Sequence, residues 1–127
     1  MATVLIVDDD PDFVETTRLV LEAHGHEAMM AADGDEALAK IRATPPDVVL
    51  LDVMMRSILE GVHVSQELWA DQDLRRIPVV MVSSIANTQH AEMFPVGEEL
   101  NIDGFLTKPI KAETLLKEIA RLTGRRK

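Results

Sequence analysis

Asp47-Val48-Val49-Leu50-Leu51-Asp52 is a run of four apolar residues between two aspartates. An apolar run of this length, with no polar alternation, indicates a strand that is buried on both faces, as the strands of a parallel sheet are. The same pattern opens the chain, where Val4-Leu5-Ile6-Val7 leads into Asp8-Asp9-Asp10. These two stretches predict strands of a parallel sheet, each with an acid at its carboxyl end.

Three further segments continue the strand pattern outward from these two. His26 to Ala31 is a weaker strand, and Val79 to Ser83 and Gly104 to Thr107 are apolar ones. Helical patterns lie between the strands, so the two kinds of element alternate along the chain. This alternation predicts one α/β domain: a doubly wound, five-stranded parallel sheet with helices on both faces.

The helices are indicated by their end signals together with apolar spacing. Asp10 before Pro11 matches an N-cap followed by proline at the first helical position, and Gly25 is a stop signal. Asp33 with Glu36 three residues later resembles a capping box. The first helix is expected to have an apolar stripe made of Val14, Leu19, Val20 and Leu21, and the second a buried face made of Ala37, Leu38 and Ile41. Two more helices are expected, at Gly61 to Ala70 and at Ala112 to Leu122.

Composition narrows the class of protein. The chain has 127 residues, 46% of them hydrophobic, which is enough for one domain with its own core. It has no cysteine, which excludes disulfides and thiolate metal sites, and a formal charge of −9, which would repel a nucleic-acid backbone. No apolar run approaches the length of a membrane-spanning helix. We therefore expect a soluble, cytoplasmic protein that does not bind DNA or membranes directly.

Chemically useful side chains gather at the carboxyl ends of the predicted strands, where ligands bind in open α/β sheets. Those ends carry three carboxylates, one hydroxyl and one ammonium, which belong to Asp8, Asp9, Asp52, Ser83 and Lys108. Such groups suit cation and phosphate chemistry. Asp10 is assigned to helix capping, and register favours Ser83 over Ser84. A site for a cation and a phosphoryl group is expected at this edge.

Val7-Asp8-Asp9, Leu51-Asp52, Val82-Ser83 and Thr107-Lys108-Pro109 resemble, as an ordered set, the motifs of the response regulator receiver domain of two-component signalling, the family of the chemotaxis regulators. The resemblance extends over nearly the whole chain. It implies the flavodoxin-like strand order 2-1-3-4-5. The expected receiver domain covers residues 1–124, with a basic tail over residues 125–127.

The resemblance also implies a role for each site residue. Asp52 would accept the phosphoryl group, and Lys108 and Ser83 would contact its oxygens. Mg²⁺, or Mn²⁺ in its place, would be held by Asp8, Asp9, Asp52 and the backbone carbonyl of Met54. Ser83 and Phe105 would be the switch residues. A histidine kinase or phosphotransfer protein would donate the phosphoryl group, and a downstream protein, or a second copy in a homodimer, would receive the signal.

Two segments depart from the family pattern. Arg56 occupies the place of a usual proline, and the loop from Arg56 to Gly61 is one residue longer than usual. The segment from Ile85 to Asp103 is also long and contains Pro95 and Gly97, so the fourth helix is expected to be short or broken. Phe105 takes the place of the switch aromatic but lacks a hydroxyl.

The signalling switch would catalyse only its own phosphorylation and slow dephosphorylation, and it would not act as an enzyme on other substrates. Two other functions are alternatives to it. The first is a magnesium-dependent phosphohydrolase with an aspartyl-phosphate intermediate. Such enzymes need a second acid two residues after the nucleophile, where this chain has Met54. The second is a nucleotide- or flavin-binding module, but no glycine-rich phosphate loop follows the first strand.

Overall fold

The computed structural model describes residues 2–52, 63–64, 66–68, 70–84, 103–108 and 110–124. The strands are β1 (Thr3–Val7), β2 (Glu27–Ala31), β3 (Val48–Asp52), β4 (Val79–Ser84) and β5 (Gly104–Lys108). The helices are α1 (Pro11–Ala23), α2 (Gly34–Ala43) and α4 (Ala112–Gly124). Residues 63–64, 66–68 and 70 are also helical and lie within the third predicted helix, at 61–70.

The strands form one parallel sheet in the order β2-β1-β3-β4-β5. After β1, the chain adds β2 on one side of that strand and then β3 on its other side, so the direction in which strands are added reverses between β1 and β3. A doubly wound sheet binds its ligands outside the carboxyl ends of the strands at such a point. The predicted doubly wound, flavodoxin-like fold is therefore confirmed, and its ligand edge contains the ends of β1 and β3.

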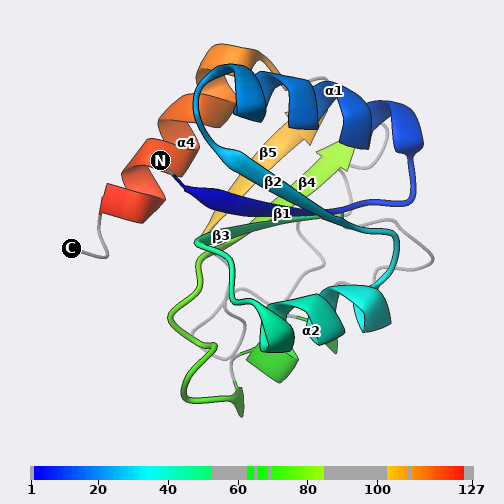
Figure 1. The fold of residues 1–127 in the computed structure, drawn as a ribbon, viewed down its shortest axis with the longest axis vertical. Coiled ribbons are helices and arrows are strands. Elements are labelled where there is room, and N and C mark those ends of the chain that lie inside the picture. Colours follow the sequence, from blue (N-terminus) through cyan, green and yellow to red (C-terminus); the bar gives the residue numbers. More distant parts are fainter. Residues whose placement is uncertain are drawn as a thin grey trace.

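Successive side chains of each inner strand enter two separate cores, because neighbouring residues of a strand point to opposite faces. Leu5 and Val7 of β1 belong to one core, and Val4 and Ile6 belong to the other. β3 is buried along its whole length. One face is covered by α2, and the opposite face by α1 and α4 (Figure 1). The apolar runs were thus correctly interpreted as strands buried on both faces.

The ends of α1 follow the predicted signals. Asp10 is the N-cap and Pro11 opens the helix, while Gly25 follows the C-cap with a φ of 84°, in the left-handed region that favours glycine. One prediction for this helix is wrong: Leu19 was expected on the buried stripe, but it is 56% exposed. Thr17 occupies the buried face instead, together with Leu21.

The start of α2 differs slightly from a capping box. The Asp33 carboxylate accepts a hydrogen bond from the Glu36 amide at 2.8 Å, as expected for an N-cap. The Glu36 carboxylate, however, accepts the amide of Ala32 at 2.8 Å, one residue before the cap. The predicted buried positions Ala37, Leu38 and Ile41 are buried in the core.

Several predictions concern parts of the chain outside the described residues. These are the long loop that contains Arg56, the broken fourth helix with Pro95 and Gly97, the Met54 carbonyl, and the tail at residues 125–127. They remain predictions. The strand bounds differ from the predicted ones by a residue at some ends, as at β5, which includes Lys108.

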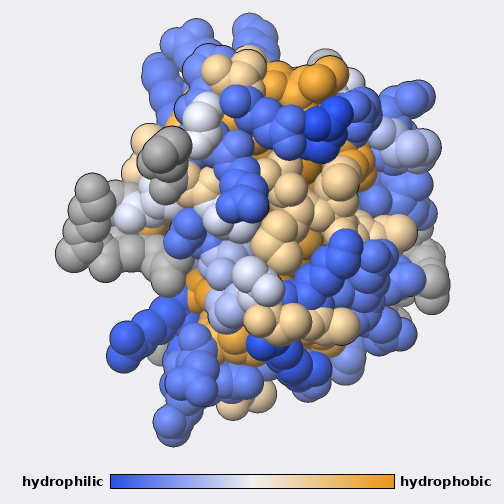
Figure 2. All heavy atoms as spheres, viewed as in Figure 1, coloured by the Kyte–Doolittle hydropathy of each residue, from blue (hydrophilic) through white to orange (hydrophobic). Residues whose placement is uncertain are grey.

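The surface on the β2 side of the molecule is mixed in character. Figure 2 shows apolar atoms across the middle of this face, between hydrophilic regions, in the view in which β2 crosses between α1 and α2 in Figure 1. Met30 of this edge strand is one of the exposed large hydrophobic side chains. None of the helices in the described part of the chain is long and apolar enough to cross a bilayer.

Candidate functional site

Three carboxylates meet where β1 and β3 end. Asp52 is the last residue of β3, and Asp8 and Asp9 directly follow β1, which pairs with β3. One carboxylate oxygen from each of the three lies within 4.8 Å of the others. Asp8 and Asp52 are buried, at 3% and 7% exposed, whereas Asp9 is exposed. The sheet topology therefore brings together the three acids that the sequence predicted as metal ligands.

Both oxygens of the Asp8 carboxylate accept hydrogen bonds within the protein. The Asp10 amide donates to Oδ1 at 2.9 Å, and the Lys108 ammonium donates to Oδ2 at 2.8 Å. The first bond fixes Asp8 from its own loop, and the second joins it to a residue 100 positions further along the chain. Asp8 is thereby held in place, while Asp9 remains open to solvent.

Lys108 lies at the carboxyl end of β5, and its side chain is only 19% exposed. Besides its ion pair with Asp8, its ammonium lies over the ring of Phe13, with Nζ 4.2 Å from the ring centroid. Sequence reasoning missed Phe13, which was not among the expected apolar positions of α1. The available signal was an aromatic residue in the first turn of a helix that starts at the acidic edge.

Asp10, the third acid of this loop, has a different role. Its Oδ1 accepts the amides of Asp12 at 3.0 Å and Phe13 at 3.4 Å. This is the N-cap geometry of α1, and an acid there also interacts favourably with the positive end of the helix dipole. The prediction that Asp10 caps the helix is confirmed.

Of the remaining predicted site residues, the structure describes Ser83 and Phe105. Ser83 is in β4, paired with Thr107, one residue beyond the Val82–Asp52 pair. Its backbone therefore lies at the same edge as Asp52. Phe105, in β5, is 42% exposed. Met54 and Pro109 are outside the described residues.

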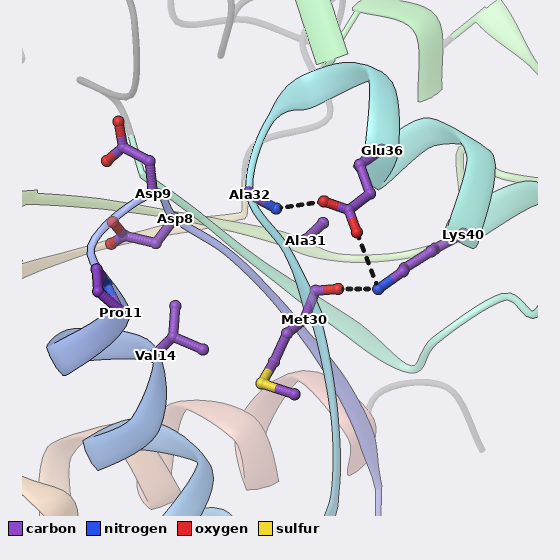
Figure 3. Close-up of a pocket in the computed structure, with 9 residues that line it drawn as sticks. All are labelled: Asp8, Asp9, Pro11, Val14, Met30, Ala31, Ala32, Glu36 and Lys40. Atoms are coloured by element: carbon purple, nitrogen blue, oxygen red, sulfur yellow. Dashed lines mark hydrogen bonds and ion pairs between the residues drawn. The ribbon is translucent and has the colours of Figure 1, made fainter.

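A cavity of about 310 Å³ opens beside the acids, between the loops that follow β1 and β2. Asp8 and Asp9 lie on one side of it, and Glu36 and Lys40 lie on the other (Figure 3). Lys40 donates to the backbone carbonyl of Met30 and is 3.2 Å from Glu36 Oε2. The Ala32 amide, followed by Lys40, lowers the pKa of the Glu36 carboxyl. On this side of the cavity, the charges of Glu36 and Lys40 therefore offset each other.

The donor set fits a small, hard divalent cation. Mg²⁺ prefers oxygen ligands and usually binds through one or two carboxylates together with retained waters. Here the three candidate ligands among the described residues are carboxylates, of which two are buried and Asp9 is exposed to water. Three clustered anions also repel one another, so a cation would relieve the repulsion. The three carboxylates therefore form a donor set that suits Mg²⁺.

The comparison with known proteins agrees with this geometry. Residues 4–120 match the model of the response regulator receiver domain. Protein PilH of Pseudomonas aeruginosa is 38% identical over 120 residues, which cover 94% of this chain and 95% of PilH. The DNA-binding response regulator MtrA of Mycolicibacterium smegmatis is 34% identical over 120 residues, but these cover only 50% of MtrA.

Solved structures give the same result. The receiver domain of a signal transduction histidine kinase from Syntrophus aciditrophicus superposes with a TM-score of 0.85 at 29% identity, covering 100% of this chain and 93% of that one. A CheY-like receiver domain protein from Methanospirillum hungatei reaches a TM-score of 0.82 at 25% identity, with 99% and 96% covered. Fold, acidic cluster and family match therefore agree: this chain belongs to the response regulator receiver domains of two-component signalling.

Proposed function

We propose that Asp52 accepts a phosphoryl group from a phosphohistidine, and that the resulting aspartyl phosphate switches the domain between signalling states. The observation that carries this proposal is the cluster of Asp8, Asp9 and Asp52 within 4.8 Å, with Lys108 bound to Asp8. An anionic nucleophile, a set of cation ligands and a fixed ammonium are the groups that phosphoryl transfer needs.

Asp52 is the best nucleophile of the three acids. Asp8 is paired with the Lys108 ammonium, and Asp9 is the exposed acid suited to hold a hydrated cation. Asp52 ends the central strand β3, which lies between β1 and β4 in the sheet. An Asp52 oxygen would attack phosphorus as the P–N bond to the donor imidazole breaks, and the leaving ring nitrogen would keep the electron pair of that bond and take a proton from water.

The other groups have supporting roles. Asp8, Asp9, Asp52 and the Met54 carbonyl would hold Mg²⁺, or Mn²⁺, which when bound neutralises charge that builds up on the transferring group. Lys108 would exchange part of its contact with Asp8 for a phosphoryl oxygen. Ser83 would donate its hydroxyl to another oxygen, and Phe105 would change position with the state of Ser83.

The partners follow from this chemistry. A histidine kinase or a phosphotransfer protein would donate the phosphoryl group, and a downstream protein or a second copy of the chain would recognise the phosphorylated state. The charge of −9 disfavours direct binding to DNA by residues 1–127. We assign the receiver unit to residues 1–124 and the basic tail to residues 125–127, and we place the protein in the cytoplasm.

Intact-mass spectrometry with acetyl phosphate and Mg²⁺ tests the proposal. The wild type should gain one phosphoryl mass, and Asp52→Asn should gain none. Asp9→Asn should gain little even at high Mg²⁺, because it removes a cation ligand. Asp10→Asn is the matched control, since it changes a neighbouring acid that caps α1, and it should be phosphorylated as the wild type is. Undiminished phosphorylation of Asp52→Asn would refute the assignment of the nucleophile.

A further inference from the structure

We infer that Phe13 is a positioning residue for Lys108: its ring face holds the ammonium at the acidic edge, where a phosphoryl group on Asp52 would meet it. The expected effect on phosphorylation rests on the proposed function, whereas the contact between Phe13 and Lys108 does not. The Lys108 Nζ is 4.2 Å from the Phe13 ring centroid and 2.8 Å from Asp8 Oδ2. An aromatic ring attracts a cation through the negative charge on its face.

The contacts of the Lys108 ammonium with Asp8 and with Phe13 differ in how many of its hydrogen-bond donors they occupy. A carboxylate neutralises the ammonium and competes with any other anion for it. A ring face attracts the ammonium without occupying its hydrogen-bond donors, of which lysine has three. Phe13 can therefore keep the Lys108 ammonium in place while its donors move from Asp8 to a phosphoryl oxygen.

This support matters because a lysine side chain is long and flexible. Fixing it in one rotamer carries a large loss of side-chain entropy. The Lys108 side chain is nevertheless only 19% exposed. The ring therefore holds the charged end at the acidic edge from a second side, in addition to the ion pair with Asp8.

The position of Phe13 is itself determined by the loop after β1. The Asp10 carboxylate accepts the Phe13 amide at 3.4 Å, and the Asp10 amide donates to Asp8 at 2.9 Å. Asp10 therefore fixes both partners of the ammonium. Phe13 also packs against the core between the sheet, α1 and α4, which limits the freedom of its ring.

Three replacements separate the charge effect of the ring from its packing. Phe13→Leu keeps an apolar side chain without a ring face. Phe13→Tyr restores a ring face. Pentafluorophenylalanine at position 13 keeps the shape of the ring but reverses the charge on its face. Val20→Ala is the matched control, because Val20 packs against the same core from the same helix but has no ring with which to attract a cation.

The first measurement is independent of phosphorylation: the NMR order parameter of the terminal methylene of Lys108. It should fall in Phe13→Leu and in the pentafluoro variant, and it should be restored in Phe13→Tyr and unchanged in Val20→Ala. Lys117, whose side chain is 77% exposed, is the internal reference. Equal order in wild type, Phe13→Leu and the pentafluoro variant would overturn the inference.

The second measurement is the rate constant of phosphorylation by acetyl phosphate. From the usual strength of a cation–π contact, Phe13→Leu should be slower by about 2-fold to 30-fold, with Phe13→Tyr near the wild type. In a Lys108→Gln background, Phe13→Leu should have no further effect. A pentafluoro variant as fast as the wild type would mean that the ring acts only by packing. If the wild type accepted no phosphoryl group, the proposed function would fail, while the order parameters would still decide the role of Phe13.

Discussion

At the scale of single residues, Asp10 shows how one residue organises the site through its side chain and its backbone without entering it. Its carboxylate caps α1, and its amide holds the Asp8 carboxylate. The sequence allowed a choice between metal ligand and cap for this acid, and Pro11 at the first helical position decided it. Capping predicts an effect on stability, whereas metal ligation predicts an effect on cation affinity.

Asp10→Ala should therefore lower the free energy of unfolding by about 1 kcal/mol, since it removes the acceptor for two helix amides. Urea denaturation measures this change. Asp10→Asn, which keeps a capping oxygen, should lose much less. Mg²⁺ affinity, measured by calorimetry, should be close to that of the wild type in both variants. A large loss of Mg²⁺ affinity with unchanged stability would instead identify Asp10 as a ligand.

His26 gives a second prediction at this scale. Its Nδ1 accepts the Ala2 amide at 3.0 Å, which joins the start of β1 to the start of β2. A protonated ring has no free acceptor at Nδ1. Burial lowers the pKa of the His26 imidazole below its ordinary value of 6.5. Between that lowered pKa and 6.5, the unfolded chain binds more protons than the folded one, so stability falls as the pH is lowered through this window.

We expect the contribution of His26 to be fully present above pH 6.5 and to disappear as the pH falls below it. His26→Gln should flatten this part of the stability profile, because a glutamine oxygen can accept the same amide but does not titrate. Urea midpoints measured between pH 5 and pH 8 in steps would reveal the difference. His63→Gln is the control, since His63 is an exposed histidine elsewhere in the chain. The same slope in wild type and His26→Gln would contradict the prediction.

At the scale of elements, the inner strands were predictable because short apolar runs that end in acids alternate with helical patterns along the chain. Their ends were not, because each end depends on a partner strand. Thr3 joins β1 because it pairs with Glu27 of β2, and its carbonyl also accepts the amide of Asp47, just before β3. Lys108 joins β5 since it pairs with Ser84.

The buried face of α1 was only partly predictable. Its apolar residues do not fall on a single stripe, and the sheet selects the face that holds Thr17 and Leu21. Leu19 is two residues from Thr17, or about 200° around the helix, and therefore points outward. The acids of the site were predictable because parallel strands end at one edge. The contact of Phe13 with Lys108 was not, since it joins α1 to the last strand of the sheet.

The fourth predicted helix carries a prediction of its own, from the sequence of residues 86–100. Pro95 removes a helical hydrogen bond, and Gly97 weakens the following turn. We expect no continuous helix here, with fast amide hydrogen exchange around residues 93–99. Amides of the fully buried strand β3 provide the slow reference. Uniform protection across residues 86–100 would show that the helix is unbroken.

At the scale of the whole molecule, the chain has a negative net charge, and the fold brings three of its carboxylates together at one edge of the sheet. The formal charge is −9, and three carboxylates lie within 4.8 Å of one another at the carboxyl edge of the sheet. Like charges at such a separation destabilise the folded state. Lys108 offsets part of this repulsion through Asp8. A bound cation would reduce the repulsion that remains between the carboxylates. Metal binding would therefore stabilise the folded domain.

Mg²⁺ should therefore stabilise the folded protein, because a ligand that binds only the folded state raises the free energy of unfolding. At 100 times the dissociation constant, the gain for one site is about 2.7 kcal/mol. Asp9→Asn should lose most of it, since it removes the exposed ligand. Asp35→Asn, which neutralises an exposed acid in the first turn of α2, should keep it. Urea denaturation with MgCl₂ and with NaCl of equal ionic strength separates site binding from charge screening. An equal gain in wild type and Asp9→Asn would show that Mg²⁺ acts on the overall charge and not at the carboxylate cluster.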